Sequence, residues 1–171
     1  MSKKQDKRLD WDHFWFLLAA LYSTRGTCDR LRAACLIVKD KRLVGAGYNG
    51  SPFGLDHCDD VGHLLINNHC ERTIHSEENA VINTERRNVV GAIAYITAIP
   101  CIRCARILIN SGVSKVNYIN VYNNSRGNKY LKMLSEKSGV KFIKHKLDLN
   151  KLFDEALERL GEAGGALNKN T

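Results

Sequence analysis

Apolar side chains recur at helical spacing near the start of the chain. Between Asp10 and Gly26 they fall on one side of a helix, with Asp10 suited to the N-cap and Gly26 to the stop. Two short β-rich runs follow, at residues 33–38 and 43–47, and residues 39–42 form a polar turn between them. This pattern predicts a helix followed by a β-hairpin.

Residues 48–73 interrupt this regularity, because the segment is dominated by Gly, Asn, Asp, His and Cys. We expect a long, irregular and functional insertion there. Beyond it, the predicted elements are a helix at 76–87, strand at 92–97, helix at 102–111, strand at 115–120, loop at 123–129, helix at 130–137, strand at 140–144 and helix at 151–160. Alternating strands and helices predict an α/β fold with parallel strands and helical crossovers.

Length and composition fit one globular domain spanning residues 1–171. The chain has 171 residues, 44% of them apolar, and only two prolines, and no repeat or linker divides it. We place the core at about residues 9–147 and expect a disordered tail at 161–171. The apolar stretch at 14–21 is far shorter than the ~20 residues that span a bilayer. No cleavage pattern follows the early lysines and arginines, so we expect a soluble, cytoplasmic protein.

The net charge does not identify a partner, but the cysteine content favours a metal-binding protein. A net charge of +8 fits attraction to phosphates, yet the basic residues are spread from end to end, as on an ordinary solvated surface. Six cysteines in a chain of this size, several of them beside histidines, favour metal binding over a disulfide framework.

Two short motifs, HSEENA at 75–80 and PCIRC at 100–104, hold the strongest candidate site. His75 and Glu77 are two residues apart and cannot share one helical face, but both can reach an atom beyond the start of a helix. Cys101 and Cys104 are three apart and share a face of a helix that opens after Pro100. We therefore expect two helix starts that face one point.

One imidazole and two thiolates supply three zinc ligands, and a catalytic zinc keeps its fourth position for water. The metal lowers the pKa of that water, and Glu77, not itself a ligand, can carry the proton. Taken singly, each motif has a simpler explanation. An early glutamate can complement a helix dipole, and a CxxC pair can be a redox pair or half of a structural zinc site.

The combined pattern resembles the zinc deaminase signature, H-x-E with P-C-x-x-C. The surrounding stretches TCDRLRAACLIV, AGYNGSPFGLDHCDD, HCERTIHSEENA and PCIRCARILINSGV are similar to those of bacterial and phage-type deoxycytidylate (dCMP) deaminases, in the cytidine/deoxycytidylate deaminase superfamily. The resemblance covers about residues 11–122. It implies a three-layer α/β/α cytidine-deaminase-like fold with a mixed five-stranded sheet.

The resemblance also implies an activity and its regulation. The expected reaction is zinc-dependent hydrolysis of dCMP to dUMP and ammonia, feeding dTMP synthesis. The zinc ligands would be His75, Cys101 and Cys104, with Glu77 as general acid and base. Family members are often homo-oligomers, dimers or hexamers, with dCTP as activator and dTTP as inhibitor, and Mg²⁺ could accompany a nucleotide effector.

Three substrate contacts are expected from the same resemblance. Asn49 of GYNG falls where the family contacts sugar or base, and Tyr122 falls where an aromatic ring lies near the base. Arg30, in the loop after the first helix, is the candidate phosphate ligand. The alternatives are a β-turn residue for Asn49, a half-buried strand end for Tyr122 and a surface charge for Arg30.

The remaining cysteines predict a second metal site. Cys35 lies in an apolar strand and fits a buried thiol, whereas Cys28, Cys58 and Cys70 lie in polar segments near several histidines. Phage-type dCMP deaminases are similar in having a second zinc held partly by cysteines at the positions of Cys28 and Cys58. We assign Cys28, Cys58, Cys70 and His69 to it, with His57 and His63 as alternative histidines. Free thiols in a mobile loop are the other interpretation.

Two rival functions stay open. A tRNA adenosine deaminase, or another cytidine-type deaminase, would use the same zinc site and is encouraged by the basic charge. No concentrated basic stripe or aromatic stacking run supports nucleic-acid binding, and we expect neither a nucleic-acid nor a membrane partner. A non-catalytic zinc module that senses dCTP or dTTP is the second rival, and it would have no need of Glu77 as a proton carrier.

Overall fold

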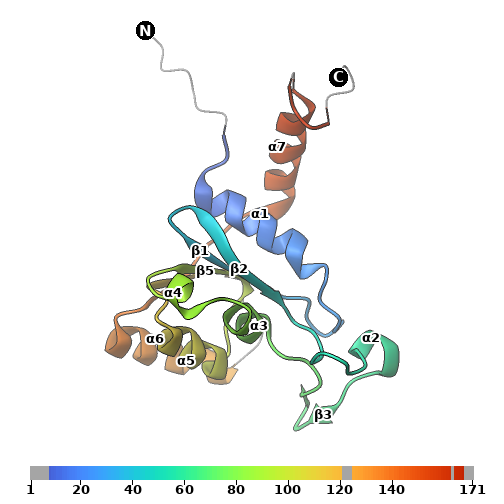
Figure 1. The fold of residues 1–171 in the computed structure, drawn as a ribbon, viewed down its shortest axis with the longest axis vertical. Coiled ribbons are helices and arrows are strands. Elements are labelled where there is room, and N and C mark those ends of the chain that lie inside the picture. The colour runs from blue at the N-terminus through green and yellow to red at the C-terminus, as the bar shows by residue number, and fades with distance from the viewer. Residues whose placement is uncertain (1–7, 121–124, 163, 168–171) are drawn as a thin grey trace.

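A mixed five-stranded sheet forms the centre of the protein, in a computed structural model that describes residues 8–120, 125–162 and 164–167 (Figure 1). The strand order is β2 (Arg42–Tyr48), β1 (Ala34–Lys39), β5 (Ile93–Ala98), β6 (Lys115–Asn120) and β7 (Lys141–Lys144). The β1 strand pairs antiparallel with β2 and β5, whereas β5, β6 and β7 run parallel. The sheet therefore combines the predicted hairpin with the predicted crossovers.

Helices cover both faces of this sheet (Figure 1). They are α1 (Trp11–Ser23), α2 (Cys58–Val61), α3 (Ser76–Ile82), α4 (Arg86–Val89), α5 (Ile102–Ser111), α6 (Ser125–Ser138) and α7 (Leu149–Gly161). The α1 helix packs on one face, and α3, α5 and α6 lie on the other, while α7 extends past α1 away from the sheet. The expected three-layer α/β/α fold with a mixed sheet is confirmed.

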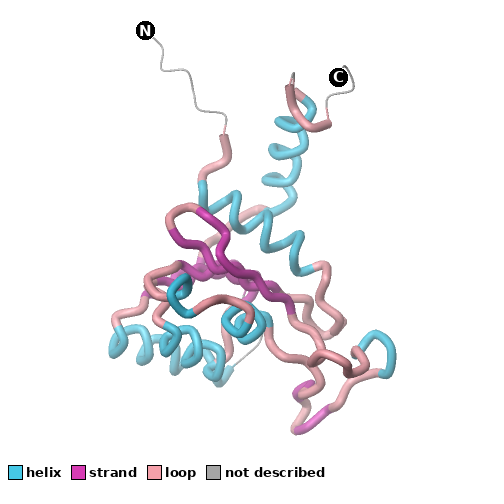
Figure 2. Tube along the Cα trace, in the orientation of Figure 1, coloured by secondary structure: helices cyan, strands magenta, loops and turns pink. Residues whose placement is uncertain are grey.

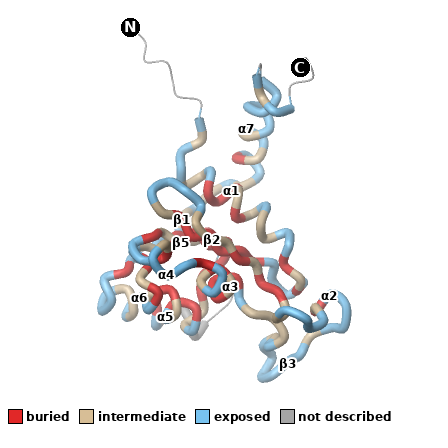
Figure 3. Tube along the Cα trace, viewed as in Figure 1, coloured by how far each residue is buried: buried red, intermediate tan, exposed pale blue. Residues whose placement is uncertain are grey.

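Side chains of β1 contribute to both halves of the core, because successive side chains of a strand point to opposite faces of the sheet. Cys35 and Ile37 are buried in the cluster under α3 and α5. Leu36 and Val38 are buried in the cluster that includes Phe16 of α1. Buried residues concentrate in the strands β1, β5 and β6, whereas the projecting insertion and α7 are mostly exposed (Figure 3).

Two predicted elements differ from the structure. The helix predicted at 76–87 is broken, since α3 ends at Ile82 and α4 begins at Arg86. The side chains of Asn83 and Thr84 donate to the carbonyls of Asn79 and Ala80, which competes with continued helix. The α6 helix begins at Ser125, inside the loop predicted at 123–129.

The insertion, residues 48–73, contains more order than its composition suggests (Figure 2). Besides α2, it holds the short antiparallel pair β3 (Leu65–Ile66) and β4 (His69–Cys70). Asn67 and Asn68 join these strands with positive φ values of 50° and 62°, as in a two-residue hairpin turn that favours asparagine.

Part of the C-terminal segment predicted as a tail is folded in the described residues. Gly161 belongs to α7, and the N–H of Leu167 donates to the carbonyl of Leu160, so this part of the predicted tail folds back on the helix. Residues 163 and 168–171 lie outside the described part. None of the helices in the described ranges is long and apolar enough to cross a bilayer.

Candidate active site and a second cysteine cluster

Two helix starts meet beside the carboxyl ends of the parallel strands. His75 is the N-cap of α3, and Cys101 is the N-cap of α5, which follows β5 after Ile99 and Pro100. The sulfur of Cys101 accepts a hydrogen bond from the N–H of Cys104 at 3.4 Å, so the thiol itself caps the helix. The predicted meeting of two helix ends is present in the structure.

The side chains of His75, Cys101 and Cys104 form the first cluster. Nδ1 of His75 lies 3.6 Å from Sγ of Cys101 and 3.3 Å from Sγ of Cys104. Ligands of one tetrahedral zinc, with bonds of about 2.0 Å to nitrogen and 2.3 Å to sulfur, would lie about 3.5 Å apart. Cys104 is buried, Cys101 is half-buried and His75 is exposed, so the cluster opens to solvent on one side. The donor set and spacing fit a zinc ion with an open position.

Hydrogen bonding prepares this cluster for a metal. The hydrogen bond from Cys104, together with His75, lowers the pKa of the Cys101 thiol to about 4. The hydrogen bond between His75 and Cys101 raises the pKa of His75 to about 9. A separate side-chain hydrogen bond between Cys104 and Cys101, together with burial, raises the pKa of Cys104. Without metal, Cys101 is thus a thiolate paired with an imidazolium. Binding a cation would release the imidazole proton and use the thiolate directly.

Glu77 lies beside these donors but is not one of them. Its side chain is only 6% exposed, and burial raises the pKa of its carboxyl group. The hydroxyl of Ser76 donates to Oε2 of Glu77 at 2.9 Å and holds the carboxyl in place. A buried carboxyl group with a raised pKa, next to a metal-type cluster, is suited to accept a proton and return it.

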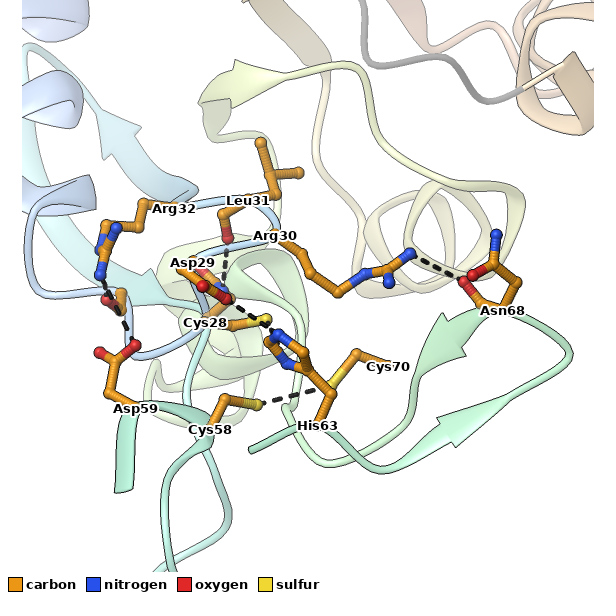
Figure 4. A network of polar contacts seen from close by, with 12 residues as sticks. Cys28, Asp29, Arg30, Leu31, Arg32, Cys58, Asp59, His63, Asn68 and Cys70 are labelled. Carbon is orange, nitrogen blue, oxygen red and sulfur yellow. Dashed lines mark hydrogen bonds and ion pairs between the residues drawn. The ribbon is translucent and has the colours of Figure 1, made fainter. Parts of the chain in front are cut away.

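A second cluster brings together Cys28, Cys58, His63 and Cys70 (Figure 4). Their ligand atoms all lie within 4.8 Å of one another. Sγ of Cys58 is 3.5 Å from Sγ of Cys70, and Sγ of Cys28 is 3.7 Å from Nδ1 of His63. Two of the four residues are fully buried. Three sulfurs and one nitrogen at this spacing fit a closed, tetrahedral zinc site.

The thiols of this second cluster are unequal. Burial and the hydrogen bond with Cys70 raise the pKa of Cys58 to about 12. Burial acts on Cys70 in the same sense, but hydrogen bonds from the Arg72 backbone and from Cys58 outweigh it and lower the pKa of Cys70 to about 7. One thiolate is therefore available near neutral pH to begin metal binding.

The histidine in this cluster is one of the two alternatives to the assigned residue. The sequence assigns His69, with His57 and His63 as alternatives, and the structure places His63 with the three cysteines. His69 and Cys70 are successive residues of β4, so their side chains point to opposite sides of the strand, and only one can face the cluster. His57 is engaged elsewhere, since its Nδ1 lies 3.1 Å from the hydroxyl of Thr27. The Asn67–Asn68 turn was the sequence signal for this hairpin, and we missed it.

The three expected substrate contacts have different surroundings. The side-chain amide of Asn49 is used by the backbone, accepting from the N–H of Ala33 at 2.7 Å and donating to the carbonyl of Leu31 at 2.8 Å. Arg30 donates to the carbonyl of Asn68 at 2.9 Å, in the turn between β3 and β4 (Figure 4). Tyr122 lies outside the described residues. Neither described residue is brought to the first cluster by a contact.

The fold and the first cluster together define a class. A sheet with helices on both faces, and an H-x-E start facing a P-C-x-x-C start, is the arrangement of zinc-dependent deaminases. Comparison with known proteins then gives the family. The model of the cytidine and deoxycytidylate deaminase zinc-binding region matches residues 9–120, so the chain belongs to this family.

Curated relatives and solved structures agree with this placement. The ComE operon protein 2 of Bacillus subtilis (strain 168) is 36% identical over 165 residues, covering 95% of this chain and 86% of the relative. The deoxycytidylate deaminase of Mycobacterium phage D29 is 30% identical over 122 residues, covering 65% of this chain and 95% of the relative. A dCMP deaminase from cyanophage S-TIM5, solved with dCMP and dUMP, shares the fold with a TM-score of 0.63. The match has 24% identity and covers 85% of this chain and 100% of that one.

Proposed function

We propose that this protein is a zinc-dependent dCMP deaminase that converts dCMP and water to dUMP and ammonia. The observation that carries the proposal is the buried carboxyl group of Glu77 beside a three-donor cluster that is open to solvent. The choice of dCMP is supported by the relatives, since those of Mycobacterium phage D29 and of Homo sapiens are named deoxycytidylate deaminases.

In the proposed mechanism, His75, Cys101 and Cys104 would hold a zinc ion. When bound, zinc supplies a water molecule whose pKa is lowered to roughly 7. Glu77 accepts a proton from the attacking water and delivers it to N3 of the cytosine ring. It then carries the second proton to the departing amino group, so that ammonia leaves and the carbonyl oxygen of dUMP remains. Ser76 keeps the carboxyl group oriented throughout by its hydrogen bond.

Replacing Glu77 with glutamine tests this mechanism. Glu77→Gln should keep the zinc content of the wild type but reduce kcat for dCMP by about a hundredfold to ten-thousandfold, the usual worth of a positioned acid-base group. Ammonia release from dCMP, CMP, deoxycytidine and tRNA adenosine would be measured alongside zinc per chain. Glu85→Gln is the control, because Glu85 forms an exposed ion pair with Arg87. Undiminished turnover in Glu77→Gln would refute the role of Glu77, and preference for tRNA would favour the rival deaminase.

We also propose that Cys28, Cys58, His63 and Cys70 hold a second, structural zinc. The fit of three sulfurs and one nitrogen to tetrahedral spacing supports it, as does the position of the four residues. They join the loop after α1 to the insertion, which otherwise has little buried apolar surface. The wild-type protein should then contain two zinc ions per chain.

Several finer expectations belong to the same proposal. Asn49, Arg30 and Tyr122 remain candidates for substrate binding, although the amide of Asn49 is already bonded to the backbone. Assembly into a homo-oligomer, activation by dCTP, inhibition by dTTP, and Mg²⁺ bound with an effector are supported by the family resemblance. A cytoplasmic location is supported by the six cysteines, none of which forms a disulfide.

A further inference from the structure

His63 is the only histidine of the second cluster, and both of its ring nitrogens have partners (Figure 4). Nδ1 faces the sulfurs, 3.7 Å from Sγ of Cys28. Nε2 lies on the other side of the ring, 2.9 Å from Oδ1 of Asp29. The imidazole of His63 therefore lies between the carboxylate of Asp29 and the sulfur atoms of the cluster.

This arrangement has a chemical consequence for the imidazole. A neutral imidazole carries one proton, and it can bind a metal only through the nitrogen that lacks it. A carboxylate that accepts from Nε2–H keeps the proton on that nitrogen, and therefore leaves Nδ1 free for the metal. It also fixes the rotation of the ring. Asp29 does both in the geometry observed.

Asp29 could instead be an ordinary surface acid, because its side chain is 66% exposed while that of His63 is 25% exposed. An exposed ion pair usually contributes little to stability. The chain supplies a comparison at an equivalent position. Asp59 also follows a cluster cysteine directly, but it pairs with Arg32 at 3.6 Å and not with a cluster residue. Comparing variants of these two acids therefore distinguishes an effect on the orientation of His63 from a general effect of surface charge.

The second cluster is also connected to the first. Thr27, the residue before Cys28, donates its N–H to the carbonyl of Asn49. The next residue, Gly50, exchanges two backbone hydrogen bonds with Ile74, at 2.9 and 3.2 Å. Ile74 directly precedes His75. A ligand set that holds the loop at Cys28 therefore also restrains the segment that presents His75.

We propose that Asp29 is a positioning residue for the second cluster, holding His63 in the tautomer and orientation in which Nδ1 completes a three-sulfur, one-nitrogen site for a divalent metal. The inference rests on the second zinc proposed above. It assigns a role to a residue that neither binds the metal nor contacts the first cluster.

Zinc affinity in the full-length protein tests this role. Zinc per chain and the transfer of zinc to an excess of a coloured chelator would be measured for the wild type, Asp29→Ala, Asp59→Ala and Cys58→Ser. Cys58→Ser identifies which phase of release belongs to the second cluster. Asp29→Ala should weaken binding in that phase by about tenfold to a hundredfold, the usual cost of losing a carboxylate partner of a ligating histidine. Asp59→Ala should match the wild type.

The effect of Asp29→Ala in a His63→Cys variant distinguishes a positioning role of Asp29 from a structural one. A thiolate has no second nitrogen to orient, so His63→Cys should make zinc binding insensitive to Asp29→Ala. If Asp29→Ala folds poorly, Asp29→Asn replaces it in both backgrounds, since an amide is a weaker, neutral acceptor. Long-range ¹⁵N NMR of His63 should also show loss of the Nε2–H form.

The possible outcomes are distinguishable. Two zinc ions per chain with unchanged release from Asp29→Ala would overturn the inference while leaving the second zinc in place. The same loss of affinity in the His63→Cys background would also overturn it. A wild type with one zinc, unaffected by Cys58→Ser, would overturn both the inference and the second zinc. The deamination proposal would still stand on the Glu77→Gln result.

Discussion

Glu77 and Glu78 are neighbours in the first turn of α3, and both are buried, yet their partners differ. Glu78 forms an ion pair with Arg103 at 2.7 Å and accepts from the N–H of His75, so it fixes the helix start. Glu77 receives a hydroxyl from Ser76 and has no basic side chain in an ion pair among the described contacts. One acid is compensated by charge and the other is left with a raised pKa.

The raised pKa of Glu77 lowers the free energy of unfolding by an amount that depends on pH. In the unfolded chain this carboxyl group ionises near its ordinary pKa of 4.5, but burial resists ionisation in the folded, metal-free protein. The folded state therefore binds more protons above that pH, and stability falls as pH rises from about 4.5 through the folded pKa. Below about 4.5 both states are protonated, and the penalty is absent.

Glu77→Gln should consequently stabilise the metal-free protein at about pH 7 and have little effect at about pH 4.5. Urea unfolding of chelator-treated wild type and variant at both pH values would measure the difference. Glu85→Gln serves again as the control. Equal stabilisation at both pH values would show that ionisation is not the cause.

The residues that gather at the first cluster could be predicted from the sequence because each motif starts a helix. Helix starts have fixed geometry, so the spacing within HSEENA and PCIRC was sufficient. The histidine of the second cluster could not be chosen in the same way. The three candidate histidines lie in a segment without a clear period, and the choice depends on which side of the two-residue strand β4 faces the cysteines.

The contact between β2 and α3 shows how closely two elements must approach at the site. A Cβ atom added at Gly47 would lie 2.3 Å from the nitrogen of Ala80 and 2.4 Å from the carbonyl oxygen of Ser76. Both are backbone atoms, so no side chain can rotate away. Only glycine lets β2 support the first turn of α3.

Gly47→Ala should therefore lower the free energy of unfolding by about 1–3 kcal/mol, the usual cost of overpacking, and should reduce turnover by shifting His75. Chemical denaturation and dCMP turnover would be measured together. Gly161→Ala is the matched control, because an added Cβ there meets no atom within 4 Å. Unchanged stability and turnover in Gly47→Ala would mean that β2 and α3 can move apart without affecting the site.

Long, strongly patterned elements were predictable, and those governed by local side-chain bonding were not. The α5 helix and the β6 strand have the predicted bounds, since a single periodicity runs through each. The break after Ile82 depends on side chains that bond to the helix carbonyls, and the apolar pattern continues across it. The β3–β4 hairpin is two residues long on each side, too short to show a period of two.

At the scale of the whole molecule, the projecting insertion bears much of the exposed apolar surface. Its large exposed apolar residues are Phe53, Leu55, Val61, Leu64, Leu65 and Ile66. Phe53 is fully exposed in the single chain. Apolar side chains gathered on a projecting segment are typical of an interaction surface.

If this surface joins copies of the chain, Phe53→Ser should shift the protein toward smaller species. Size-exclusion chromatography with light scattering would give the mass over a range of concentrations. Leu157→Ser is the control, because Leu157 is also exposed but lies on α7, away from the insertion (Figure 1). An unchanged mass for Phe53→Ser would place any subunit contact elsewhere.

The order of the two clusters along the chain has a consequence for how the protein is made. Cys28, Cys58, His63 and Cys70 all precede His75, and Cys101 and Cys104 come later still. At typical rates of translation, roughly 2 to 7 seconds separate the synthesis of Cys70 from that of Cys104. If the second cluster holds zinc as proposed, it could bind that ion on the ribosome while the first cluster still lacks both thiols. The nascent chain would then load its two metals in sequence, with the segment before His75 already anchored when the last donors emerge.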